Sequence, residues 1–142
     1  MMKKPKLSLM IVEDDDIDYL AIDRALKKTD IDAHMYRAKN GGEALQLLED
    51  EIVTKPVIFL VDLQMPRLNG IEFLHHVRKS AKYHDSVVCV LSTSNDPGDI
   101  FDCYRYQIAA YFEKSRLNGD YKPLIDLLHL YDTHVSLPAD YL

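Results

Sequence analysis

The sequence contains no apolar run of the roughly 20 residues that a membrane-crossing helix needs. Its first residues, MMKKPKLSLMIVEDDD, are basic at the tip but turn acidic after one short apolar run, unlike a secretory signal peptide. Cysteine is scarce too. Cys89 and Cys103 fall in a predicted strand and a predicted helix, which favours reduced, buried thiols over a disulfide or a metal site. These absences predict a cytoplasmic protein with no membrane partner.

Clusters of lysine and arginine are also missing, although the chain has 17 basic and 23 acidic residues. Direct binding to nucleic acid needs such clusters to neutralise phosphates, so a net charge of −6 argues against a nucleic-acid partner. What is present is the balance of a soluble globular protein, with 47% hydrophobic and 28% charged residues. A length of 142 residues predicts one domain with a sizeable core.

Short apolar runs of strand length alternate with segments of helical periodicity. The predicted strands are Leu7–Val12, Asp32–Ala38, Val57–Val61, Val87–Leu91 and Ala109–Phe112. The last helix is predicted from about Tyr121 to about Tyr131, which places one domain at 1–132 and a C-terminal tail at 133–142. Five strand–helix units of this kind predict an α/β fold, a doubly wound parallel sheet with helices on both faces.

Polar side chains follow four of these strands. Glu13 to Asp16 follow the first strand, Asp62 the third, Ser92 and Thr93 the fourth, and Lys114 the fifth. Doubly wound sheets bind ligands at the carboxyl ends of their strands, so we expect these side chains to meet there. Close carboxylates repel one another unless a cation compensates them, and Mg²⁺ prefers oxygen ligands of this kind. With a lysine and a hydroxyl opposite, the pattern predicts a carboxylate that can be phosphorylated beside a metal ion.

Four segments carry a resemblance to a known family: MIVEDDD, VDLQMPRLNG, VCVLSTSND and YFEKS. In this order and spacing they resemble the receiver domains of two-component response regulators, over about Leu7 to Tyr131. The Leu-Ser-Thr-Ser run and the Lys114-Ser115 pair are most similar to single-domain regulators associated with phytochrome-type histidine kinases. The resemblance implies a flavodoxin-like sheet with strand order 2-1-3-4-5.

The resemblance also implies roles for the residues at the metal and phosphoryl site. Asp62 falls at the phosphoacceptor position, and Asp14 matches the direct metal ligand. Glu13 matches the acidic partner that usually acts through a metal-bound water, and the backbone carbonyl of Gln64 matches a further ligand. Lys114 matches the lysine that pairs with the phosphoryl group. The implied cofactor is Mg²⁺.

Four further residues match positions that shape or move the site. Ser92 falls at the switch hydroxyl that closes on the phosphoryl group, and Tyr111 at the aromatic position that swings inward in the active state. Pro66 and Gly70 match the residues that shape the loop after the acceptor. The implied function is a signalling switch rather than a turnover enzyme. Its implied donor is a sensor histidine kinase, phytochrome-type or hybrid.

Each of these residues also has a plainer interpretation. Asp62 could cap a turn, and Lys114 could be an ordinary surface lysine. The acidic run suits a helix N-terminus, so Asp15 and Asp16 are better interpreted as cap and first turn than as part of the site. A tyrosine on an edge strand, such as Tyr111, is often there for packing. The run before Asp62 and the Gln64-Met65-Pro66 after it favour the acceptor interpretation.

The chain departs from the family pattern after the lysine, where Ser115 replaces the usual proline. A cis bond to a residue other than proline costs about 2.5–4 kcal/mol, so we expect Lys114–Ser115 to be trans. Ser92, in place of threonine, keeps the hydroxyl but loses the methyl group that restrains its rotamer.

Two rival functions remain. A phosphatase with an aspartyl-phosphate intermediate typically has a second aspartate two residues after the nucleophile, where this chain has Gln64. A degenerate receiver would bind partners without phosphorylation, which the full set of site residues argues against. The expected output is a protein contact, including a possible homodimer, through the fourth helix, fifth strand and final helix. That surface carries Tyr104, Tyr106 and Tyr111.

Overall fold

The computed structural model describes residues 5–65 and 68–139. Its centre is a sheet of five parallel strands in the order β2-β1-β3-β4-β5. The strands are β1 (Leu7–Val12), β2 (Ala33–Ala38), β3 (Val57–Asp62), β4 (Val87–Ser92) and β5 (Ala110–Glu113). Every residue of β1 and β3 is buried, because these central strands are covered on both faces. The predicted fold class and strand order are therefore confirmed.

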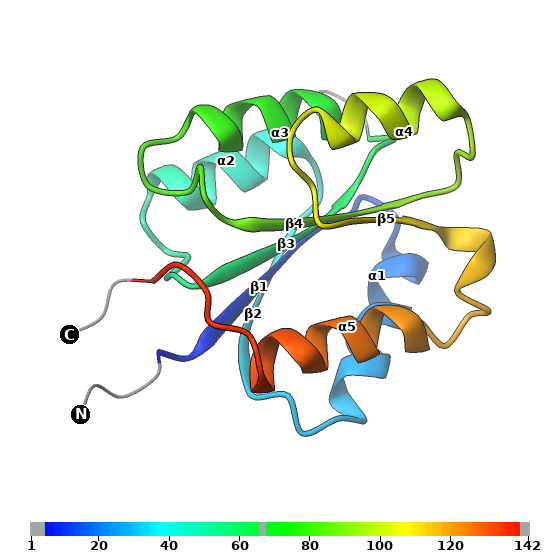
Figure 1. The fold of residues 1–142 in the computed structure, drawn as a ribbon, viewed down its shortest axis with the longest axis horizontal. Helices are drawn as coiled ribbons and strands as arrows, with labels where there is room; N and C mark the ends of the chain where they lie inside the picture. The colour runs from blue at the N-terminus through cyan, green and yellow to red at the C-terminus, as the bar shows by residue number, and fades with distance from the viewer. Residues whose placement is uncertain (1–4, 66–67, 140–142) are drawn as a thin grey trace.

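Helices cover the two faces of the sheet unequally (Figure 1). The helices are α1 (Asp16–Lys27), α2 (Gly41–Glu49), α3 (Gly70–Lys79), α4 (Pro97–Tyr104) and α5 (Lys122–Thr133), with a short 3₁₀ helix, η1 (Lys114–Arg116), after β5. Figure 1 shows α2, α3 and α4 on one face and α1 and α5 on the other. None of the described helices combines the length and the apolar character needed to cross a membrane.

Alternate residues of the central strands supply two separate cores, since neighbouring side chains of a strand point to opposite faces. Met10 and Phe59 belong to the core beneath α2, α3 and α4. Leu9 and Ile58 belong to the core above α1 and α5. The chain runs from β1 to β2 in one direction across the sheet and from β3 to β5 in the other, so the order reverses between β1 and β3. In doubly wound sheets, ligands bind outside the carboxyl ends of the strands at such a point.

The predicted element boundaries hold to within two residues. β5 begins and ends one residue later than predicted, and α5 extends to Thr133. Residues 134–139 have no helix or strand, but Leu137 packs against the core on the α1 and α5 side. Asp96 lies at the N-cap of α4 with proline next, as predicted, although its side chain accepts no capping hydrogen bond.

Candidate functional site

Three carboxylates meet at the carboxyl ends of β1 and β3. The two strands are paired in parallel register through Val12 and Val61, so Glu13 and Asp62 come next to each other. One carboxylate oxygen from each of Glu13, Asp14 and Asp62 lies within 4.8 Å of the others. Glu13 and Asp62 are buried, whereas Asp14 is exposed. The structure therefore brings together the three acidic side chains that the sequence predicts as a metal site.

The surroundings of the acceptor candidate Asp62 favour its protonated form. Burial, followed by repulsion from Glu13, raises the pKa of the Asp62 carboxyl to about 8, against the opposing effects of Lys114 and the Gln64 backbone N–H. A cation among these carboxylates would remove that repulsion. All three donors are hard oxygens, which matches the ligand preference of Mg²⁺, so the residues present fit a divalent metal ion.

Lys114 lies beside the carboxylates, at the first residue of η1. Its Nζ is 2.8 Å from Glu13 Oε1 and 2.7 Å from Asp18 Oδ2, but 3.8 Å from Asp62 Oδ1. Burial alone would lower the pKa of Lys114, but hydrogen bonds to Asp18 and Glu13 outweigh it and raise the pKa. In this structure the lysine is charged, and it bonds to Glu13 and Asp18 rather than to Asp62.

The loops after β3 and β4 are joined by hydrogen bonds. The Gln64 backbone N–H donates to Asp62 Oδ1 at 3.4 Å, and the Gln64 side-chain oxygen accepts from the Thr93 hydroxyl at 3.1 Å. Ser92 ends β4 and is fully buried, and its Oγ accepts from the backbone N–H of Ser94 at 3.0 Å. The predicted switch hydroxyl thus lies at the end of β4, and the predicted carbonyl ligand lies in the loop after β3, which the Thr93–Gln64 hydrogen bond joins to the loop after β4.

Gly70 allows α3 to begin close to Asp62. Its backbone N–H donates to the Leu63 carbonyl at 3.1 Å, and a Cβ at this position would lie 2.7 Å from the Asp62 carbonyl oxygen. A larger residue would therefore push the helix and the acceptor loop apart. Pro66, the other residue predicted to shape this loop, lies outside the described residues.

Tyr111, the predicted aromatic switch, is partly buried on the edge strand β5. Its hydroxyl donates to the Ser94 carbonyl at 2.9 Å, and this ties β5 to the loop after β4. Tyr111 therefore contacts the loop that follows Ser92, the last residue of β4.

Several local predictions are confirmed. Asp15 is the N-cap of α1, where its Oδ1 accepts from the backbone N–H groups of Ile17 and Asp18. The one cis peptide bond among the described residues is Lys55–Pro56, so Lys114–Ser115 is trans. Both cysteines are buried and unpaired.

The sequence interpretation missed two residues that contact the site. Arg37, on β2, donates to the Glu13 carbonyl from Nε and Nη2, and pairs with Asp16 at 2.7 Å. Asp18, on α1, pairs with Lys114. The place of Asp18, three residues after the N-cap Asp15, indicates a helix-capping role and not a contact with Lys114. Neither Asp18 nor Arg37 therefore had a local signal for its contact with the site.

Comparison with known proteins adds an independent line of evidence. The sequence profile of the family described as "Response regulator receiver domain" matches residues 9–120. Response regulator Rcp1 of Synechocystis is 27% identical over 140 residues, which cover 95% of each chain. The probable methanogenesis regulatory protein FilR2 of Methanothrix harundinacea is 25% identical over 126 residues, 87% of this chain and 81% of that one.

Solved structures agree with the sequence matches. The Mn²⁺-bound form of Rcp1 superposes with a TM-score of 0.84 at 28% identity, covering 95% of this chain and all of that one. The phosphorylated cyanobacterial phytochrome response regulator RcpA has the same fold, with a TM-score of 0.85 at 24% identity and the same coverage. The predicted similarity to phytochrome-associated regulators is thus confirmed. The chain belongs to the receiver-domain family of two-component response regulators.

Proposed function

We propose that this chain is a phosphorylation-dependent switch that takes a phosphoryl group from a sensor histidine kinase onto Asp62, with Mg²⁺ as cofactor. The observation that carries the proposal is the position of Asp62. It ends β3 within 4.8 Å of two further carboxylate ligands and 3.8 Å from the Lys114 ammonium group. Receiver-family membership supports a phosphoacceptor site here over a plain cation site.

In the proposed transfer, an Asp62 carboxylate oxygen attacks the phosphorus of a phosphohistidine. The new P–O bond forms as the P–N bond breaks, and the imidazole leaves with the electron pair and takes up a proton. Asp62 must be ionised to attack, although its surroundings raise the pKa of its carboxyl to about 8. When bound by Glu13, Asp14, Asp62 and the Gln64 carbonyl, Mg²⁺ supplies positive charge that favours the ionised carboxylate and neutralises phosphoryl oxygens.

Lys114 and Ser92 act on the phosphoryl oxygens in this proposal. Lys114 provides a compact positive charge. The Ser92 oxygen accepts from the Ser94 backbone N–H, which leaves the hydroxyl proton available for a hydrogen bond to the phosphoryl group. Water later attacks the phosphorus, inorganic phosphate leaves and Asp62 is regenerated. The chain resets itself in this way, so it acts as a switch and not as an enzyme on a separate substrate.

The comparisons support the proposed partner and metal. Rcp1 has been crystallised with Mn²⁺, an ion of the same ligand preference as Mg²⁺. A response regulator described as acting in red light signalling of R. palustris, RPA3017, is 25% identical with a TM-score of 0.76. We therefore propose a phytochrome-type kinase as the donor, with residues 1–132 as the receiver and the segment from 133 as its tail.

The proposed output surface consists of α4, β5 and α5. On α4, Phe101 is 70% exposed and Tyr104 48% exposed, and their spacing of three residues puts them on the same face of the helix. Tyr111 links this surface to the loop after β4. Phosphorylation that moves Ser92 would alter this link, so we propose that self-association or kinase affinity changes through this surface.

The acceptor assignment is tested by intact-mass measurement after incubation with a small phosphodonor and Mg²⁺. The wild-type chain should gain one phosphoryl group, and Asp62→Asn should gain none, because an amide is a far poorer nucleophile. Asp126→Asn is the matched control, since Asp126 is an exposed carboxylate on α5. Equal uptake in Asp62→Asn and the control would refute Asp62 as the acceptor.

The output surface is tested by light scattering with and without beryllofluoride, a stable mimic of the phosphoryl group. Light scattering reports a change in the mass of the assembly, and a binding titration reports a change in affinity for the kinase. One of these changes should appear in the wild type and be lost when Tyr104 and Tyr111 are replaced by alanine. A change that survives both replacements would place the interface on another face.

A further inference from the structure

Lys114 is held by two carboxylates, and neither belongs to the phosphoacceptor. Its distances to Asp18 and Glu13, 2.7 and 2.8 Å, are those of strong charge-assisted hydrogen bonds. The 3.8 Å to Asp62 is too long for a hydrogen bond. To neutralise a phosphoryl group on Asp62, the ammonium must therefore lengthen or give up one of its present bonds.

Asp18 occupies a position from which a side chain can help to cap the N-terminus of a helix. It is three residues after the N-cap Asp15, where a carboxylate can reach back to the N-cap backbone N–H. At the start of α3, Glu72 does this for Asn69. In α1 the Asp15 N–H donates instead to Glu13 Oε2 at 3.2 Å, and Asp18 turns to Lys114. Its side chain is therefore committed to the site rather than to the helix end.

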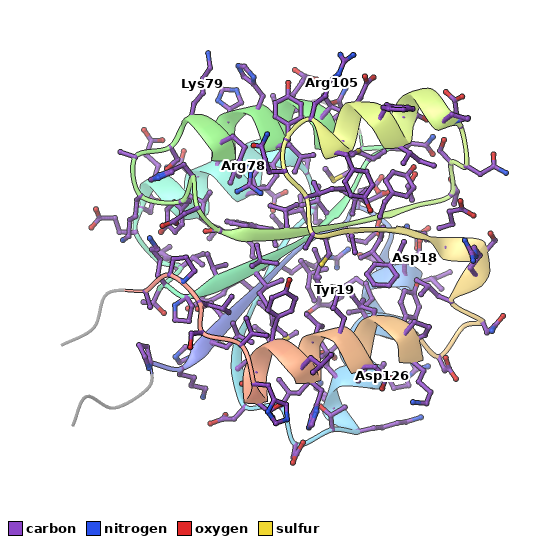
Figure 2. The ribbon with its side chains drawn as sticks, in the orientation of Figure 1. Asp18, Tyr19, Arg78, Lys79, Arg105 and Asp126 are labelled. Atoms are coloured by element: carbon purple, nitrogen blue, oxygen red, sulfur yellow. The ribbon has the colours of Figure 1, made fainter. Side chains whose placement is uncertain are left out.

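The two partners of Lys114 differ in how readily they can be released. The Glu13 side chain is 2% exposed, so water cannot replace Lys114 as its partner. The Asp18 side chain is 32% exposed and can be rehydrated in place. It also lies in the first turn of α1, where the helix dipole favours a carboxylate. Figure 2 shows Asp18 on the side of the molecule where β5 continues into η1. Of the two bonds, the one to Asp18 breaks at lower cost.

From this geometry we propose that Asp18 is the counter-ion that holds Lys114 in the unphosphorylated chain, and that Lys114 exchanges Asp18 for phosphoryl oxygens on Asp62. Asp18 is thus a positioning residue that acts through Lys114. This inference rests on the proposed function, since it needs a phosphoryl group at Asp62. The exchange also leaves Asp18 unpaired on α1, beside the exposed Ile17 and Leu20.

Removing the charge of Asp18 should therefore favour the phosphorylated state. Asp18→Asn no longer competes strongly for Lys114, so beryllofluoride with Mg²⁺ should bind about two- to fivefold more tightly, the range expected for a partly exposed ion pair. The phosphoryl lifetime on Asp62 should lengthen in the same variant. Asp18→Glu keeps the charge and should return both quantities toward the wild-type values.

The matched control is Asp15→Asn, which removes one negative charge three residues away and keeps an N-cap side chain of equal quality. The measurement is calorimetric titration of the full chain with beryllofluoride at fixed Mg²⁺, with thermal unfolding to verify that each variant is folded. An affinity gain in Asp18→Asn well beyond that of Asp15→Asn supports the exchange. Equal effects in the two variants, or weaker binding in Asp18→Asn, overturn it.

A double variant shows whether Asp18 acts through Lys114. In a Lys114→Ala background, Asp18→Asn should change beryllofluoride affinity no more than Asp15→Asn does, because the competing partner is gone. A full Asp18 effect that persists without Lys114 would overturn the exchange. Failure of the proposed function is recognised separately, since the wild-type chain would then gain no phosphoryl group at all.

Discussion

Lys114 and Arg78 are two partly buried cations with opposite surroundings. Lys114 lies among three carboxylates, and of the three Asp62 is its most distant partner. Arg78, on α3, instead donates to four backbone carbonyls, and Figure 2 shows it turned toward the sheet while Lys79 points outward. Its acceptors are Tyr106 at 2.6 Å, Ser86 at 2.7 Å, His84 at 2.8 Å and Gln107 at 3.0 Å.

The difference separates a fixed part of the molecule from a movable one. The planar guanidinium of Arg78 has its donors in a rigid fork, and its acceptors belong to the loops before β4 and β5. The ammonium of Lys114 is a compact point charge that can turn from one oxygen to another at small geometric cost. Arg78 thus holds two loops in place, while Lys114 lies in the charge cluster that we propose a phosphoryl group rearranges.

The largest expected effect on stability is at Arg78. Arg78→Met would remove the donor of four carbonyls, of which those of Tyr106 and Ser86 accept part-buried hydrogen bonds, so the free energy of unfolding should fall by about 3 kcal/mol. Arg78→Lys should recover only part of the loss, because an ammonium cannot reproduce the fork. The control is Arg105→Met, whose side chain is 77% exposed and should change stability by less than about 0.5 kcal/mol. Urea unfolding of the three variants measures these losses. If Arg78→Met and Arg105→Met lost stability equally, the hydrogen bonds of Arg78 would not hold the two loops in place.

Replacing Asp62, unlike replacing Arg78, should raise the free energy of unfolding near pH 8. The folded pKa is about 8, whereas an unfolded aspartate has a pKa of about 4, so the folded chain binds the proton more tightly. In EDTA the wild-type stability should therefore fall as pH rises from about 4 to about 8. Asp62→Asn removes this slope and should be more stable than wild type at pH 8 by about 1–2 kcal/mol. Denaturant unfolding across this pH range tests this, with Asp126→Asn as control. If both variants kept the wild-type slope of stability against pH, the Asp62 carboxyl would not be its cause.

Metal addition should reverse the instability of the carboxylate cluster. At ten times its Kd, Mg²⁺ should raise the free energy of unfolding of the wild-type chain by about 1.4 kcal/mol. Asp14→Asn removes a formal charge from the proposed ligands and should lose most of this gain, whereas Asp15→Asn should keep it. Thermal unfolding with and without Mg²⁺ tests this, and an equal gain in Asp14→Asn would move the metal elsewhere.

The smallest expected effect concerns Tyr111, which lies between the fixed and the movable parts. Tyr111→Phe removes the hydrogen bond to the Ser94 carbonyl and should cost about 0.5–1 kcal/mol. Tyr106→Phe is the control, since its hydroxyl makes an exposed contact of 3.4 Å with His75 and should change stability little. If urea unfolding shows the same loss in the free energy of unfolding for both variants, the hydrogen bond of Tyr111 to the loop after β4 does not stabilise the fold.

Local sequence patterns were sufficient for much of the fold and for the acidic part of the site. The run Val57–Val61 predicted a buried central strand, and Asp62 followed it at the edge of the sheet, as the structure confirms. Asp15 was predicted as a helix cap from its place before a helical pattern, and it caps α1. Patterns of this kind are readable because strands and caps depend on residues close together in the chain.

The sequence by itself therefore determined the parallel sheet, its covered faces and the carboxylates at its edge. Only the tertiary structure decided which partner each cation takes. Lys114 meets Asp18 across 96 residues, and Arg78 meets the carbonyls of Tyr106 and Gln107 across 28 and 29. No local rule relates positions so far apart. The packing of α1 against the end of β5, and of α3 against the loop after α4, brings these groups within hydrogen-bonding distance.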